Sequence, residues 1–155
     1  HGVAASIEDG GEGCSAYPQS VTRAVLVGLE RGVAGASVLS RANEIPIRTI
    51  DVGVVGLSPS DKKHANVISA PNKLKSGTKN FCLEPAMTPG ECQRCIEMGR
   101  MYLREYVEET SAKVVALGEV GIGNTTSSSA LIAALTNEPI ESICGGGAYA
   151  SKALD

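Results

Sequence analysis

The residues best suited to chemistry lie in one glycine-rich segment, which reads VVALGEVGIGNTTSSS over 114–129. Its apolar start predicts a short strand over 113–117, and a helix is expected to follow with Thr125 or Thr126 as its N-cap. Gly121 and Gly123 allow a ligand to approach the backbone closely. A helix N-terminus offers unpaired N–H groups and the positive end of the helix dipole. The segment therefore predicts a phosphate-binding loop that needs no lysine.

A carboxylate, Glu119, stands at the edge of this loop. Because a carboxylate repels a phosphate, its use would be to stabilise a developing positive charge or to remove a proton. The alternative is that the loop only packs a strand tightly against a helix. Its spacing lacks the third glycine of a dinucleotide-binding fingerprint and the lysine of a P-loop. From the loop alone, both interpretations remain open.

The elements that must position this loop alternate between helix and strand. We expect a helix from the cap Ser20 that is interrupted at Gly32 and continues over 33–42, a buried strand over 47–55, a loop over 58–72, a helix over 89–110, the strand over 113–117, a helix ending at 135 or 136, and a short helix after Pro139. This alternation favours an α/β fold with parallel strands and crossover helices. Two strands are too few for a stable open sheet, so the chain is expected to be part of a longer protein.

The helix over 89–110 has the clearest sequence signals. Thr88 is expected to cap it, Pro89 takes the first helical position, and Glu91 completes a capping box. One apolar stripe is expected to be buried: Cys92, Cys95, Ile96, Gly99, Leu103, Tyr106 and Val107. The two cysteines on that stripe are therefore interpreted as core residues, and no metal site is expected.

Composition excludes several classes of function. The 155 residues carry a net charge of −3, which gives no basic face for nucleic acid. No apolar run is long enough to span a membrane. The five cysteines are odd in number and irregularly spaced, which indicates reduced thiols rather than a disulfide framework. We therefore expect an intracellular protein, in the cytoplasm or an organelle interior, that binds a small molecule.

Four blocks of sequence, in order, resemble the nicotinate-nucleotide:dimethylbenzimidazole phosphoribosyltransferase family. They are H-G-V-A (1–4) with S-A-Y-P-Q (15–19) and V-T (21–22), D-V-G-V (51–54), G-T-K-N-F (77–81) with P-A-M-T (85–88), and G-E-V-G-I-G-N-T-T (118–126). Together they extend over nearly the whole chain. Residues 7–13 and 57–72 differ from the family pattern as insertions.

This resemblance implies a Rossmann-like, three-layer αβα domain with a parallel sheet, of which residues 1–155 form one partial domain. It implies a homodimeric transferase of cobalamin biosynthesis that moves phosphoribose from nicotinate mononucleotide to 5,6-dimethylbenzimidazole, with no cofactor. By position, Glu119 is an active-site glutamate, and Tyr17 and Pro18 line the benzimidazole pocket. The phosphate and nucleotide are assigned to Gly121, Gly123, Asn124, Thr125, Thr126 and Gly147.

One departure from the family concerns catalysis. The family's C-terminal R-L-G-E-G motif, which carries its main catalytic base, has no counterpart in these residues. The chain on its own is therefore expected to be inactive. The competing hypothesis is a catalytically dead relative that serves as a structural or binding subunit of a larger assembly.

Overall fold

The fold combines five α-helices with a small parallel sheet in the residues described, which are 1–7, 14–15, 17–57, 67–70, 73–74 and 77–145 of a computed structural model. The elements in chain order are η1 (Gly2–Ile7), α1 (Ser20–Glu30), α2 (Gly35–Ala42), β1 (Thr49–Asp51), β2 (Val67–Ser69), α3 (Pro89–Thr110), α4 (Asn124–Thr136) and α5 (Ile140–Ile143). The α/β class expected from the alternation of elements is confirmed at this level.

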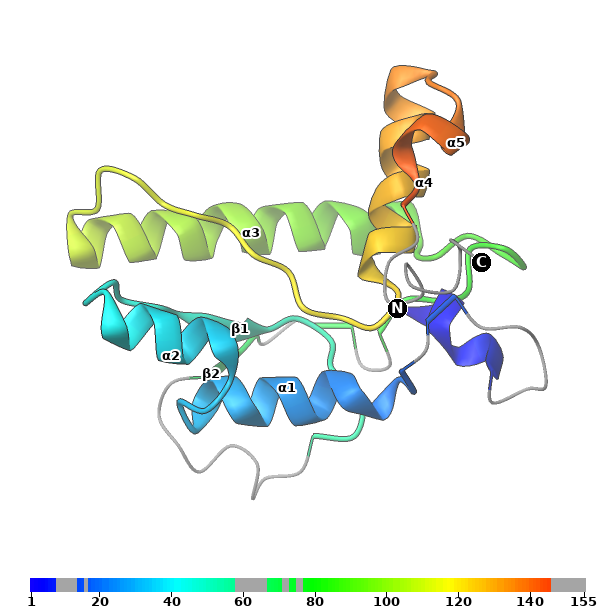
Figure 1. Cartoon of the computed structure of the whole chain (residues 1–155). Coiled ribbons are helices and arrows are strands. Elements are labelled where there is room, and N and C mark those ends of the chain that lie inside the picture. The colour runs from blue at the N-terminus through cyan, green and yellow to red at the C-terminus, as the bar shows by residue number, and fades with distance from the viewer. Residues whose placement is uncertain (8–13, 16, 58–66, 71–72, 75–76, 146–155) are drawn as a thin grey trace.

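The sheet lies between two helices. β1 and β2 pair in parallel, with Thr49 opposite Val67 and Asp51 opposite Ser69. Figure 1 shows α3 along one side of the strands and α1 along the other, with α4 rising near the N-terminus of the chain. The strands therefore form the middle layer of this part of the molecule.

The small core is built between α3 and the sheet. Met98 and Tyr102 of α3 are buried against Ala70, with Ile50 and Cys95 packed beside them. The predicted buried stripe on α3 was wrong in most members. Cys92, Ile96, Leu103 and Val107 are exposed, because the face that meets the sheet is the one that carries Cys95, Met98 and Tyr102. Burial raises the pKa of the Cys95 thiol, as expected for a packed cysteine.

A second set of contacts fixes the C-terminal half of α3 to the segment that leads into β1. The guanidinium of Arg48 lies 4.9 Å from the centre of the Tyr106 ring and is paired with Glu109. The Tyr106 hydroxyl donates to the backbone carbonyl of Pro46 at 3.1 Å. These contacts join residues about 60 positions apart and set the direction of α3 over the sheet.

Several helix predictions are confirmed. The helix from Ser20 breaks at Gly32, whose φ of +72° is a left-handed conformation, and α2 follows. α3 begins at Pro89 with the capping box between Thr88 and Glu91 in place. Two caps were predicted wrongly. Gln19, not Ser20, takes the cap position of α1, and α4 begins at Asn124 with Gly123 before it, so neither threonine is its cap.

The strand predictions were less accurate. The strand expected over 47–55 covers only Thr49–Asp51, and the loop expected over 58–72 contains β2. Residues 113–117 are irregular, and the side chains of Val114 and Leu117 are 88% and 85% exposed. A strand is stable only beside a partner, and no described strand pairs with this segment.

The charge at the end of β1 is buried. Asp51 is 1% exposed, and its carboxylate accepts hydrogen bonds from Gly53 N at 3.1 Å and Val54 N at 2.9 Å as well as from the Lys73 ammonium. Burial acts to raise the pKa of Asp51. The hydrogen bonds from Lys73 and the two backbone N–H groups outweigh it and hold this pKa below its ordinary value. The carboxylate therefore stabilises the turn after β1.

Candidate active site

The loop before α4 is held by the N-terminal part of the chain. The backbone nitrogen of His1 donates to Ile122 O at 3.3 Å, and Ile122 N donates to the hydroxyl of Thr22 in α1 at 3.0 Å. The Gln19 amide donates to His1 O at 3.4 Å. Residues 1, 19, 22 and 122 thus form one hydrogen-bonded group, although they come from separate stretches of the sequence.

The other motif blocks join this group. Gly2 N donates to the hydroxyl of Thr78 at 3.0 Å, which connects η1 to the block over 77–81. That block is tied to the segment before α3 by the bond from Lys79 N to Ala86 O at 2.8 Å. A Cβ added at Gly53 would lie 3.6 Å from the Cα of Gly77, which places the block over 51–54 against the block over 77–81. The blocks picked out in the sequence therefore lie side by side in the fold.

Glu119 lies at this meeting point and has a specific partner. Its Oε1 is 3.1 Å from His1 Nε2, and Nδ1 of the same ring is 3.3 Å from the hydroxyl of Ser127. Burial acts to raise the pKa of Glu119. Hydrogen bonds from His1 and Asn124, with the charge of His1, outweigh burial and hold this pKa below its ordinary value. Glu119 is therefore an ionised carboxylate at neutral pH.

Two glycines make this arrangement possible. Gly123 has a φ of +86°, and a Cβ there would lie 3.2 Å from side-chain carbons of Val3 and Ala4. A Cβ on Gly121 would lie 2.8 Å from the His1 ring and 2.9 Å from Glu119 Oε1. Gly123 lets the chain turn into α4 against η1, and Gly121 leaves room for the histidine–glutamate pair.

The N-terminus of α4 keeps one backbone hydrogen-bond donor available among the described residues. Asn124 N donates to Gly121 O at 2.9 Å, Thr125 N to the Asn124 side chain at 2.8 Å, and Ser127 N to Gly123 O at 3.1 Å. No described residue accepts a hydrogen bond from Thr126 N. The Thr125 side chain is exposed and that of Thr126 is half-buried. This end of α4 thus presents a donor and the positive end of the helix dipole, which suits an anion.

Two of the remaining predicted site residues lie at the surface. Tyr17 is 53% exposed and Pro18 is exposed, next to Gln19, which contacts His1. Their assignment to a benzimidazole pocket stays a prediction. Gly147 lies outside the described residues.

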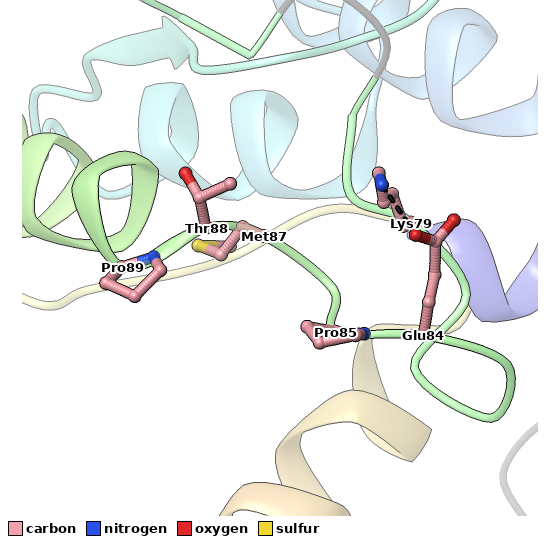
Figure 2. A pocket seen from close by; sticks show the side chains of 6 residues that line it. All are labelled: Lys79, Glu84, Pro85, Met87, Thr88 and Pro89. Carbon is pink, nitrogen blue, oxygen red and sulfur yellow. Dashed lines mark hydrogen bonds and ion pairs between the residues drawn. The ribbon is translucent and has the colours of Figure 1, made fainter.

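A separate hollow opens beside the block over 77–88. Figure 2 shows its lining side chains, and its volume is about 310 Å³. The ammonium of Lys79 and the carboxylate of Glu84 pair at 2.6 Å across one side of it. The other lining residues are Pro85, Met87, Thr88 and Pro89. This hollow contains none of the predicted site residues.

Sequence reasoning left His1, Thr22 and Ser127 out of the site. Their positions gave a signal, because His1 and Thr22 belong to the first motif block and Ser127 follows directly after the last. Pairing across more than one hundred residues could not be read from spacing.

Neither a metal cluster nor a membrane span occurs in the described residues. They contain no group of three or more His, Cys, Asp or Glu side chains placed to hold a metal ion. No helix among them is both long enough and apolar enough to cross a membrane.

Comparison with known proteins identifies the family of this chain. A family model described as phosphoribosyltransferase matches residues 1–154. Nicotinate-nucleotide–dimethylbenzimidazole phosphoribosyltransferases of Desulforamulus reducens and Thermus thermophilus are 42% and 40% identical over 147 residues, covering 95% of this chain. The crystal structure of CobT from Thermus thermophilus superposes with a TM-score of 0.82 at 38% identity over 96% of the chain.

The matched region is only part of each relative. It covers 38% and 40% of the two enzymes and 41% of the CobT chain, so the chain spans about two-fifths of the length of these proteins. Within that span, the family model, the identity and the superposition all agree. The chain belongs to the phosphoribosyltransferase family that its motif blocks resemble.

Proposed function

We propose that the complete protein transfers phosphoribose from nicotinate mononucleotide to 5,6-dimethylbenzimidazole, giving α-ribazole 5′-phosphate and nicotinate. The observation that carries this proposal is the meeting of Glu119 with the N-terminus of α4, where motif blocks from separate parts of the chain converge. The names of relatives that are 35–42% identical over this stretch support the same reaction.

The proposed reaction exchanges one base for another on the ribose. The bond from C1′ to the pyridinium nitrogen of nicotinate mononucleotide breaks, and its electron pair leaves with nicotinate. A benzimidazole nitrogen forms the new bond to C1′, and the proton on the other nitrogen must then be lost. Glu119 has the right charge to stabilise the positive ribose in the transition state, and the proton would go to the base that the family carries in its C-terminal motif.

The phosphate would bind at the N-terminus of α4. Thr126 N is available as a donor, and the Thr125 hydroxyl is exposed beside it. In this assignment the backbone of Gly121 and Gly123 and the side chain of Asn124 shape the loop around the nucleotide, with Gly147 as a further contact. Tyr17 and Pro18 would line the site of the incoming base.

The larger organisation is also a proposal. The parallel pair of β1 and β2 would be the beginning of a Rossmann-like, three-layer sheet, and the complete protein would be a homodimer. All five cysteines are free thiols, which fits an intracellular compartment. The net charge of −3 argues against a nucleic-acid partner. The family's C-terminal base motif is absent from these residues, so they would not catalyse the reaction alone.

The test is nicotinate release from nicotinate mononucleotide by the complete protein, with and without dimethylbenzimidazole. The exposed Glu97 on α3 offers a matched control. Release should depend on the base, fall by about 10²-fold or more in Glu119→Gln, and persist in Glu97→Gln. Nucleotide binding without release would instead favour the catalytically dead binding subunit, and equal rates in the two variants would remove Glu119 from the mechanism.

A further inference from the structure

Ile122, the residue between the two glycines of the loop before α4, is held on both sides of its backbone. Its N–H donates to the hydroxyl of Thr22 in α1 at 3.0 Å, and its carbonyl accepts from the backbone nitrogen of His1 at 3.3 Å. Both bonds are partly buried, and they join positions 100 and 121 residues apart. The loop is therefore anchored at Ile122 to the N-terminal part of the chain.

The neighbours of Ile122 cannot supply such an anchor. Gly121 and Gly123 have no side chains, and a glycine backbone loses more conformational freedom on ordering than that of any other residue. Their carbonyl groups accept from backbone nitrogens of α4, at 2.9 Å and 3.1 Å, and so bind the loop only to the helix that follows it. In the described residues, the hydrogen bond that links this loop directly to α1 is the one from Ile122 to Thr22.

Thr22 lies on the inward face of α1. It precedes the buried Leu26 by one helical turn, and residues four apart in a helix share a face. A hydroxyl on that face needs a polar partner, which Ile122 N supplies. A partly buried backbone N–H needs an acceptor in return. The two groups therefore satisfy each other, and Thr22→Val would keep the shape of the side chain while removing the acceptor.

We propose that Thr22 is a positioning residue for phosphate recognition, because its hydroxyl fixes the loop at Ile122 and so aims the first turn of α4 before the nucleotide arrives. This inference rests on the proposed function, which places the phosphate at that end of α4. In this role Thr22 acts through the backbone that runs from Ile122 to Thr126, and not by contact with the nucleotide.

The anchor should favour the phosphate more than the rest of the nucleotide. Thr126 N, the donor that this helix end keeps available, follows the anchored residue in the first turn of α4. A loop with two glycines that is ordered before binding loses less conformational entropy when the ligand binds. Loss of the anchor should therefore weaken the contact with the phosphate, whereas a ligand that has no phosphate gains little from it.

The first part of the test is amide hydrogen exchange of Ile122 in the complete protein, followed by NMR without ligand. Exchange should be at least about tenfold faster in Thr22→Val and close to the parent rate in Thr22→Ser, which keeps the hydroxyl. Thr136→Val is the matched control, because it makes the same replacement at the exposed last residue of α4 and should leave the rate unchanged. Unchanged exchange in folded Thr22→Val overturns the proposal.

The second part compares the affinities for nicotinate mononucleotide and for nicotinate riboside, which has no phosphate. The preference for the mononucleotide should fall about three- to tenfold in Thr22→Val and return in Thr22→Ser. A purely structural role would weaken the binding of both compounds alike, and that result also overturns the proposal. Thr22→Ala, which lacks the acceptor as well, decides the question if the valine variant does not fold.

The same comparison separates this inference from the proposed function. A parent protein that binds the two compounds equally refutes the phosphate site itself, and the inference with it. A parent that prefers the mononucleotide, with a preference that folded Thr22→Val retains in full, refutes the role of Thr22 alone.

Discussion

Replacing Gly123 by alanine tests the junction between η1 and α4. The φ of +86° places this residue in the left-handed region, which costs an alanine about 1–2 kcal/mol relative to glycine. The new Cβ would also lie 3.2 Å from carbons of Val3 and Ala4, both buried, and 3.4 Å from the sulfur of Cys14. Overpacking of this kind costs about 1–3 kcal/mol. The free energy of unfolding should therefore fall by about 2–5 kcal/mol.

The assay is equilibrium denaturation of the complete protein, with Gly118→Ala as the matched control. Gly118 belongs to the same loop, but its added Cβ would meet no atom within 4 Å. Its effect should stay within about 0.5 kcal/mol. If Gly123→Ala and Gly118→Ala unfold at the same denaturant concentration, α4 does not pack against η1 as described, and the reasoning about the site fails.

Three further predictions concern other positions. Asp51→Asn should destabilise the fold by about 3 kcal/mol at neutral pH, because it leaves a lysine without its buried partner. The pKa of Asp51 is lowered in the fold, so the parent should also lose stability as the pH falls below about 4. The variant should not show the loss that comes from protonation of Asp51, and unfolding experiments over a pH series would measure the difference. Thr88→Ala should lower stability by about 1 kcal/mol in thermal or denaturant unfolding, because it removes the cap of α3. Gly121→Ala should leave the fold stable by circular dichroism and reduce nicotinate release, because its Cβ displaces the side chains of His1 and Glu119; unchanged release would argue against that pair.

Local signals in the sequence were sufficient for the helices. The Thr88-Pro89-Gly90-Glu91 start of α3 and the glycine break between α1 and α2 depend on neighbouring residues, and both were predicted. The buried face of α3 depends instead on what packs against it. Apolar spacing alone selected Ile96 and Leu103, whereas the sheet meets Met98 and Tyr102.

The strands and the site also depend on contacts between distant segments, which local sequence signals do not show. β2 lies in a stretch that looked like a polar loop, and its pairing with β1 supplies the stability that its own sequence does not indicate. The strand expected at 113–117 has no partner among the described strands. Glu119 and the glycines of its loop could be selected from residue types. The role of His1 could not, because the bond to Glu119 joins positions 118 residues apart.

The central claim is that the converging blocks form a nucleotide site at the N-terminus of α4. Its most direct test is calorimetric binding of nicotinate mononucleotide and of nicotinate riboside, which lacks the phosphate. The complete protein should bind the mononucleotide at least about tenfold more tightly, because a charged phosphate contributes about 1.4 kcal/mol or more at such a helix end. Thr125→Val should reduce this preference, and Ser128→Ala should keep it. Equal affinity for the two compounds, or a preference that Thr125→Val leaves intact, would contradict the account.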